Sequence, residues 1–154
     1  MIDFSRVEEY REGNRIEAKK ALGGLPHSIW ETYSAFANTI GGVILLGVEE
    51  WKDKSFHTVD LPDPEGMIAE FWTLVNDPKV VNVNVLSPAD VFVEVVNGDR
   101  IIAVCVPPAA KRPVYINNDP LTGSYYRNGE GDFRFTRAEV ERMLADSRET
   151  PPAL

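Results

Sequence analysis

Apolar residues recur along the chain at two different spacings, and the spacing separates expected helices from expected strands. The apolar positions of residues 28–40 are Ile29, Tyr33, Phe36 and Ile40. This spacing of three or four predicts a helix with one apolar face, and Ser28 and Glu31 have the capping-box spacing at its start. Gly41 should end the helix, because glycine adopts the left-handed C-terminal conformation without steric cost. The apolar run 43–48 then predicts a buried strand.

The middle of the chain predicts a second helix and a group of strands. Residues 64–76 form the helix, with Asp63 as its N-cap and Pro64 in its first turn. Its apolar face consists of Met67, Phe71, Leu74 and Val75. A period of two then predicts a strand through Val81, Val83 and Val85. Residues 91–96 and 100–106 flank Asn97-Gly98, a hairpin signal that Asp99 widens, so we expect an antiparallel meander of three strands.

The last third predicts short strands at residues 114–116 and 124–127, followed by a helix that Thr136 and Glu139 begin with a capping box. The whole pattern predicts an α+β fold, with a mixed, mainly antiparallel sheet and about three helices in a single domain at residues 1–147. Residues 148–154 contain two adjacent prolines and are expected to be a frayed tail or a linker to a further C-terminal region.

Composition narrows the class of protein. The chain has 154 residues, of which 44% are hydrophobic and 26% charged, as in globular domains that bury a core. The longest apolar run is far shorter than the ~20 residues of a membrane span, and no signal peptide begins the chain, so no membrane partner is expected. Cys105 is the single cysteine and cannot form an internal disulfide. We therefore expect a cytoplasmic protein.

Charge limits how nucleic acid could be bound. The net charge of −8 argues against strong nonspecific binding to DNA, because the attraction of basic residues to phosphates dominates such binding. The acidity is concentrated in residues 61–100, which hold seven acidic and two basic residues. A local basic patch remains compatible with this distribution. The candidates for phosphate contact are Lys19, Lys111, Arg112, Arg127 and Arg134.

A second group of residues suggests metal chemistry. Glu17 and Lys19 point to the same face of an extended segment, because strand side chains alternate. With Glu12 before them and Glu50 after the next strand, they resemble the layout of many metal-dependent nucleases, in which carboxylates hold Mg²⁺ and lysine stabilises charge. The alternative interpretation is solvated charge at strand ends, which composition alone favours.

Two other kinds of site are not expected. His27 and His57 are isolated and, with one cysteine, do not form a zinc site. The chain contains no G-x-x-x-x-G-K-[ST] motif, so no ATP site of the P-loop type is expected in it.

Several strings together resemble one known family, the Schlafen-type AlbA domain. They are Glu12…Glu17-Ala18-Lys19, Leu25-Pro26, Ser-Ala-Phe-Ala-Asn-Thr-Ile-Gly-Gly at residues 34–42, Gly-Val-Glu-Glu at 47–50, and the late segments 112–117 and 123–129 with Asp132. The resemblance covers roughly residues 8–146. It implies a DNA-binding domain of the kind found at the N-terminus of bacterial transcriptional regulators and helicase-like proteins.

The resemblance also implies a candidate activity. In animal Schlafens a three-carboxylate pocket cleaves RNA, and Glu12, Glu17 and Glu50 match its positions, with Lys19 at the position of its lysine. Two positions differ from the nuclease pattern. Glu50 stands where the pattern has Asp, which adds a methylene to a site where Mg²⁺ demands tight geometry, and Ala18 stands where Phe is common.

Three functions therefore remain open at this stage. The leading hypothesis is a nucleic-acid-binding module, for DNA before RNA, within a bacterial regulator or helicase-like protein. The second is a metal-dependent endoribonuclease in which Glu12, Glu17 and Glu50 bind Mg²⁺ or Mn²⁺ and Lys19 assists. The third is a protein-interaction module, including a homodimer.

Overall fold

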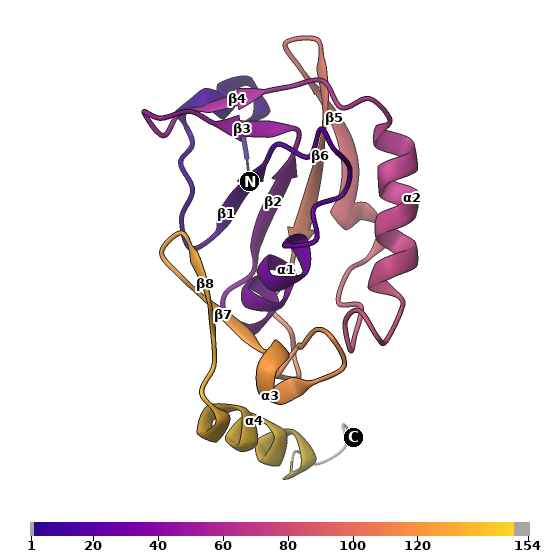
Figure 1. Ribbon diagram of the computed structural model, residues 1–154. Helices are drawn as coiled ribbons and strands as arrows, with labels where there is room; N and C mark the ends of the chain where they lie inside the picture. The colour runs from indigo at the N-terminus through magenta and orange to yellow at the C-terminus, as the bar shows by residue number, and fades with distance from the viewer. Residues whose placement is uncertain (1, 150–154) are drawn as a thin grey trace.

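The computed structural model describes residues 2–149, and a four-stranded sheet lies at its centre (Figure 1). The strand order is β1-β2-β6-β5. The strands are β1 (Ile16–Lys19), β2 (Gly42–Leu46), β5 (Val91–Val96) and β6 (Asp99–Val106). β1 runs parallel to β2, whereas β2–β6 and β5–β6 are antiparallel, so β1 is an edge strand.

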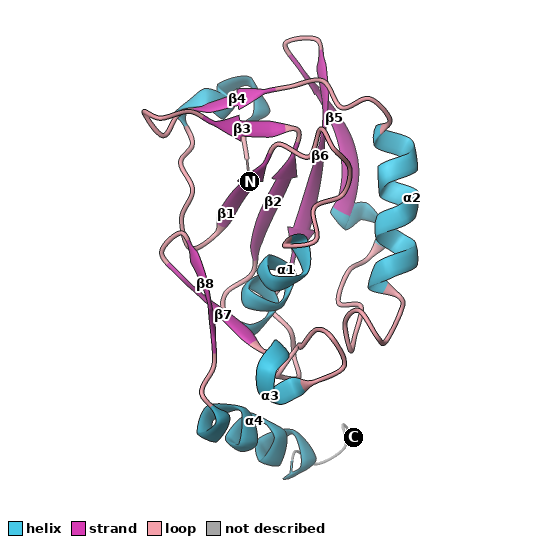
Figure 2. Ribbon diagram, viewed as in Figure 1, coloured by secondary structure: helices cyan, strands magenta, loops and turns pink. Residues whose placement is uncertain are grey.

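Helices and two small hairpins surround this sheet (Figure 2). The helical segments are η1 (Phe4–Glu9), α1 (Ile29–Asn38), α2 (Pro64–Val75), η2 (Pro88–Asp90), α3 (Pro120–Gly123) and α4 (Arg137–Glu149). One hairpin pairs β3 (Val48–Glu50) with β4 (Phe56–Thr58), and the other pairs β7 (Tyr125–Asn128) with β8 (Gly131–Arg134). The turns of both hairpins lie on the β1 side of the sheet (Figure 1).

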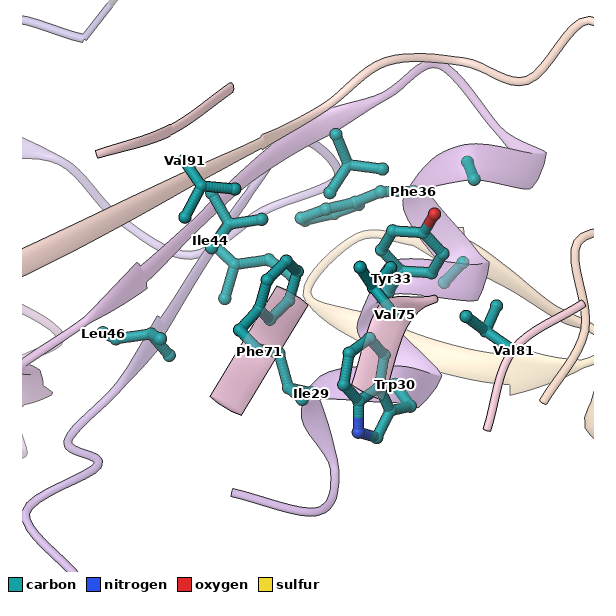
Figure 3. Close-up of a cluster of buried hydrophobic side chains, with 14 of the residues drawn as sticks. Ile29, Trp30, Tyr33, Phe36, Ile44, Leu46, Phe71, Val75, Val81 and Val91 are labelled. Carbon is teal, nitrogen blue, oxygen red and sulfur yellow. The ribbon is translucent and has the colours of Figure 1, made fainter. Parts of the chain in front are cut away.

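The main core lies between the sheet and helices α1 and α2. Figure 3 shows Phe36 of α1 and Phe71 of α2 directed toward Ile44 of β2, with Tyr33 of α1 in the same cluster. Phe36, Tyr33 and Ile44 are fully buried. A smaller cluster on the opposite face of the sheet packs η1 and the β3–β4 hairpin against alternate residues of β2 and β6. The sheet is therefore apolar on both faces.

Two glycines position the chain around β2. Gly41 has φ +78°, and its N–H donates to Phe36 O at 2.8 Å, which ends α1 in the predicted left-handed conformation. Gly47 has φ +90° and separates β2 from β3. A Cβ at Gly47 would lie 3.0 Å from the Leu61 side chain, so this bend requires glycine. The predicted strand 43–48 is thus divided between two sheets.

Much of the predicted architecture is confirmed. The fold is α+β, with a mixed, mainly antiparallel set of sheets, and the long helices among the described residues are the α-helices α1, α2 and α4. Asp63 caps α2 by accepting from the Gly66 N–H, and Thr136 and Glu139 form the predicted capping box. Asn97 and Gly98 both have positive φ at the β5–β6 turn.

The start and end of α1 differ from the prediction. Ser28 makes no side-chain cap, because it adopts helical φ and ψ where a capping residue is extended. Its hydroxyl accepts a hydrogen bond from Lys19 Nζ at 3.1 Å instead. Ile40 is 46% exposed and not on the buried face, because α1 ends at Asn38 and the chain turns away after it. Asp99 pairs with Val96 in the ladder and does not widen the hairpin loop.

The predicted strand through Val81, Val83 and Val85 is wrong, and so is the three-strand meander. The Tyr33 hydroxyl donates to Val83 O and accepts from the Val85 N–H, both at 2.9 Å. A buried side chain thus satisfies the backbone groups that a strand neighbour would otherwise pair. The third strand of the antiparallel group is β2.

The last third was predicted in part. The predicted strand 114–116 forms only isolated bridges, from Ile116 to Val81 and from Tyr115 to Ser124. The segment expected at 124–127 is strand β7, and its partner β8 was not predicted. Helix α4 continues to Glu149, and residues 150–154 of the expected tail lie outside the described residues. No helix within residues 2–149 is long and apolar enough to cross a membrane.

Candidate functional site

The predicted carboxylates gather around the edge strand β1. Glu17 and Lys19 lie on the same face of β1, as their alternation predicts, and their partners in β2 are Ile44 and Leu46. Those partners belong to the core under α1, so Glu17 and Lys19 stand on the α1 side of the sheet. Their side chains are 14% and 12% exposed, and Lys19 Nζ lies 3.7 Å from Glu17 Oε2.

Arg127 of β7 is the second cation that holds Glu17. Its Nη1 lies 2.9 Å from Glu17 Oε1 and 2.7 Å from Asp132 Oδ1, and its side chain has no exposed surface. Nε donates to the carbonyls of Gly13 and Gly129, and Nη2 donates to Ile16 O. The guanidinium also lies over a core aromatic ring, the side chain of Phe36, at 5.0 Å from its centroid.

This network fixes the β7–β8 hairpin to the start of β1. Asp132 of β8 accepts a second hydrogen bond from Thr32 Oγ1 of α1 at 2.7 Å, so the hairpin is also bound to the helix. The Arg127 donors are occupied by protein oxygens, and the group is sealed from solvent. Arg127 was predicted to contact phosphate, but this placement makes it a residue that positions Glu17.

Glu12 closes the open edge of β1. On the inner side of β1, the carbonyls of Arg15 and Lys19 accept hydrogen bonds from β2 and from Gly47. On the outer side, the Ala18 N–H donates to Glu12 Oε2 at 3.0 Å. Burial raises the pKa of Glu12 to about 7, and the negative charges of Glu17 and Glu50 add to the shift, against the Ala18 hydrogen bond that lowers it.

Glu50 and Glu130 complete a cluster with Glu12. One carboxylate oxygen from each of the three residues lies within 4.8 Å of the other two. Glu50 ends β3, whereas Glu130 lies in the turn between β7 and β8. Among the side chains that the structure describes, Glu50 Oε2 is a buried oxygen without a hydrogen-bond partner. Lys54 Nζ approaches the cluster from outside, 3.7 Å from Glu50 Oε1 and 3.9 Å from Glu130 Oε1.

The structure thus brings the three predicted carboxylates together and adds Glu130, which the sequence reasoning missed. Glu17 lies beside Glu12, but two cations hold its two oxygens, and Glu130 takes the third place in the cluster. The local sequence around Glu130 is a glycine-flanked turn. Such a turn carries no signal for a metal ligand, because tertiary contacts, those of Arg127 among them, bring it to β1.

The remaining predicted basic residues do not form one patch with these side chains. Lys111 is exposed, and Arg112 Nη2 donates to Thr39 O, just beyond α1, at 2.7 Å. Arg134 is exposed on β8, where its Nε donates to the Tyr125 hydroxyl at 3.2 Å. Lys111 and Arg134 therefore present charge to solvent, while Lys19 and Arg127 are internal to the carboxylate region.

The cluster has the chemistry of a site for a hard divalent cation. Magnesium and manganese prefer carboxylate oxygens, and Glu12, Glu50 and Glu130 offer three of them at close range. Two observations fit an ion at this position. The raised pKa of Glu12 reflects excess negative charge as well as burial, and the free oxygen of Glu50 has no protein partner.

Comparison with known proteins places this geometry in a family. The family model described as Schlafen, AlbA_2 matches residues 12–136, which include all four carboxylates. Among curated proteins, none matches the sequence. Among solved structures, the N-terminal domain of a protein from Nitrosomonas europaea, whose name relates it to the ATP-dependent DNA helicase RecG, is similar with a TM-score of 0.65 and 31% sequence identity. The alignment covers 88% of this chain and 95% of that domain.

A second solved structure is similar in fold. The DIP2311 protein from Corynebacterium diphtheriae has a TM-score of 0.57 at 20% identity, over 87% of this chain and 27% of that one. At this identity the likeness shows the fold alone. The family match, in contrast, covers well over half of the chain and includes the motifs around β1 and α1. This protein therefore belongs to the Schlafen AlbA_2 family.

Proposed function

We propose that this domain binds nucleic acid, DNA before RNA, as a module of a larger bacterial regulator or helicase-like protein in the cytoplasm. The observation that carries the proposal is the similarity to the Nitrosomonas europaea domain, which is 31% identical over nearly its full length and whose name includes a DNA helicase. Family membership over residues 12–136 supports the same function.

The charges of the surface limit how the nucleic acid is held. Lys111 and Arg134 are exposed and can reach phosphates, whereas Arg127 is fully buried by its own partners. The carboxylate cluster beside β1 repels phosphate unless a cation neutralises it. We therefore expect binding of moderate strength that increases when a divalent cation is added.

Substitution of single exposed basic residues tests this proposal. Lys111→Ala and Arg134→Ala should each weaken binding about equally for different sequences and reduce the slope of log K against log salt by roughly one. Fluorescence anisotropy of labelled DNA and RNA measures both quantities. Glu94→Ala, on the edge strand β5, is the control variant, because it changes a charged residue far along the sheet from β1. Unchanged affinity and slope in the double variant of Lys111 and Arg134 would remove these residues from the interface.

A second candidate function, metal-dependent cleavage of RNA, is favoured by the cluster of Glu12, Glu50 and Glu130. These residues would hold the ion, and Glu17, oriented by Arg127, lies next to them. A bound Mg²⁺ or Mn²⁺ would supply polarisation of a phosphoryl oxygen and activation of water. Lys19, 3.7 Å from Glu17, would place a positive charge near the reacting phosphate.

Neighbouring residues of β3 provide a matched test of this candidate. Glu50→Gln keeps the shape of a cluster member and removes its charge, while Glu49→Gln makes the same change at a residue outside the cluster. We expect Mn²⁺ to raise the melting temperature of the wild type and of Glu49→Gln, but not of Glu50→Gln. We also expect the wild type and Glu49→Gln to cleave labelled transfer RNA slowly, and Glu50→Gln not to cleave it. Equal melting shifts and equal RNA survival in all three proteins would leave the carboxylates as a surface feature.

A further inference from the structure

The turn between β3 and β4 presents a tryptophan beside the carboxylate cluster. Trp51 is 52% exposed and directly follows Glu50, a member of the cluster. Lys54 of the same turn reaches back to Glu50 and to Glu130 of the other hairpin, at 3.7 and 3.9 Å. Hydrophobic burial does not explain this position of the indole, because half of its surface remains in water.

The indole is held in a fixed orientation. One face stacks on the His57 imidazole, with ring centroids 3.3 Å apart and an angle of 16° between the planes. Ser55 Oγ lies within hydrogen-bond distance of imidazole Nε2, at 2.7 Å, and Glu8 Oε1 lies 3.8 Å from Nδ1. Because one face is covered and half of the residue is exposed, the opposite face of the indole is open to solvent.

The turn itself is closed by backbone hydrogen bonds. The Trp51 N–H donates to Ser55 O at 2.9 Å, and the Lys54 N–H donates to Trp51 O at 2.8 Å. Lys54 adopts the left-handed conformation, with φ +72°, as tight turns require. A planar group that stacks on Trp51 therefore meets a preorganised surface, which lowers the entropic cost of binding.

The charged residues of the turn complement a phosphodiester. Lys52 and Lys54 are exposed on either side of Asp53. The Asp53 carboxylate accepts from the Ser55 N–H and hydroxyl, so it is engaged inside the turn. Glu49, the acid before the cluster, lies 4.0 Å from Lys20. The turn thus places two exposed lysines next to an open aromatic face, and Lys54 is also paired with Glu50 and Glu130 of the cluster.

We propose that residues 51–55 form a platform for an unpaired nucleotide of DNA or RNA, with its base stacked on Trp51 and adjacent phosphates on Lys52 and Lys54. This inference rests on the proposed nucleic-acid binding and specifies which form of nucleic acid is bound. A duplex keeps its bases stacked on one another, so an open indole face fits a single strand. A strand held there would lead its backbone toward Glu50 and Glu130, and a divalent cation would strengthen its binding.

Binding of single strands to Trp51 variants tests the platform. Fluorescein-labelled oligo-dT and oligo-U of about twelve nucleotides, and a DNA duplex of equal length, are titrated in Mg²⁺ and followed by anisotropy. Trp51→Ala should weaken binding of the single strands about ten- to hundredfold, the loss that follows from removing one base–aromatic stack, while Trp51→Phe retains most of the affinity. Val95→Ala, an exposed apolar residue on the opposite edge strand, should bind as the wild type does.

Intrinsic fluorescence supplies a second readout that a structural role would not change. Binding of oligo-dT or oligo-U should quench the wild-type tryptophan emission, and Trp51→Phe should abolish that quenching although Trp30 and Trp72 remain. Comparison of the two strands shows whether DNA or RNA is the ligand. Equal single-strand affinity in the wild type and Trp51→Ala, at unchanged melting temperature, would overturn the platform alone. Failure of the wild type to bind any of the three probes would overturn both the platform and the proposed function.

Discussion

The Arg127 side chain carries a positive charge and has no exposed surface. The free-energy cost of burying this charge must therefore be offset by the carboxylates that face it. Glu17 and Asp132 provide two such partners, and three backbone carbonyls accept hydrogen bonds from Nε and Nη2. A buried ion pair of this kind contributes little compared with an apolar replacement, but the loss of one partner leaves uncompensated charge. Arg127 therefore determines the position of Glu17 and of the hairpin that carries Glu130.

Removal of the Arg127 side chain tests this role. Arg127→Ala should destabilise the domain by about 3–5 kcal/mol, because Glu17 and Asp132 then remain as partly buried carboxylates without a cation. Urea unfolding measures the change. Arg134→Ala, seven residues further along the same hairpin and exposed, is the control and should cost about 0.5 kcal/mol or less. Equal losses in the two variants would contradict the assignment of Arg127 as the residue that positions the site.

Glu12 should give the domain an unusual dependence on pH. Its pKa is raised from 4.5 to about 7, so the folded state binds this proton more tightly than the unfolded chain does. The resulting stability is fully present below pH 4.5 and is lost as the pH rises through about 7. Without divalent cations, the melting temperature of the wild type should therefore fall across this range.

Two comparisons check the origin of that fall. Glu12→Gln should flatten the profile, because the amide does not titrate, and Glu49→Gln should leave it as in the wild type. A bound divalent cation favours the ionised carboxylate and should also flatten the wild-type profile. Parallel profiles for the wild type and Glu12→Gln would exclude Glu12 as the titrating group.

At the scale of elements, α1 connects the core to the site. Its inner face packs Tyr33 and Phe36 onto the sheet, and its first half binds the β7–β8 hairpin through Thr32. The buried residues Ser34 and Asn38 hydrogen-bond to the backbone of residues 114 and 125. Helix α1 therefore fixes the position of the β7–β8 hairpin relative to β1.

Substitutions in and just after α1 should differ in their effect on stability, because one position is buried and the other is exposed. Phe36→Ala should destabilise the domain by about 3–5 kcal/mol, since the ring is fully buried and also supports the Arg127 guanidinium. Ile40→Ala, just beyond the end of the helix and 46% exposed, should cost about 0.5 kcal/mol or less. Chemical denaturation of both variants distinguishes the faces. A loss below about 1 kcal/mol for Phe36→Ala would show that the core under α1 is assigned incorrectly.

Elements were predictable where neighbouring residues decide the conformation. The caps at Asp63 and Thr136, the turn at Asn97-Gly98 and the stop at Gly41 depend on side chains or backbone freedom within a few residues. The segment 81–85 has the period of a strand, yet the distant Tyr33 hydroxyl binds its backbone instead. Alternation indicates a half-buried segment but does not show which group will satisfy its backbone.

In the whole molecule, the site is assembled from three separate segments of the chain. Glu12 precedes β1, Glu17 lies in β1, Glu50 ends β3, and Glu130 lies in the β7–β8 turn. The spacing of Glu12, Glu17 and Glu50 gave only a weak indication that they belong together, and the resemblance to the Schlafen-type AlbA domain was needed to group them. The spacing could not include Glu130, because its proximity to the others results from two hairpins that fold back onto the same edge of the sheet.

The same assembly explains how an acidic protein can bind nucleic acid. A net charge of −8 excludes a uniform basic surface, but the carboxylates beside β1 can be neutralised by a divalent cation, and Lys52, Lys54, Lys111 and Arg134 remain exposed. Affinity should then depend on phosphate contacts at a few positions, so it should depend on salt and on divalent cations.

The salt dependence of nucleic-acid binding by the wild-type domain shows whether the domain binds through phosphate contacts. Anisotropy of labelled single-stranded and duplex probes in Mg²⁺, between about 50 and 200 mM salt, gives the association constant at each concentration. We expect the domain to bind, with a log K that falls linearly as log salt rises. This dependence follows from the release of counterions when several phosphates are contacted. Absence of binding, or binding that does not change with salt, would contradict the account and leave a protein-interaction or homodimerisation module as the function.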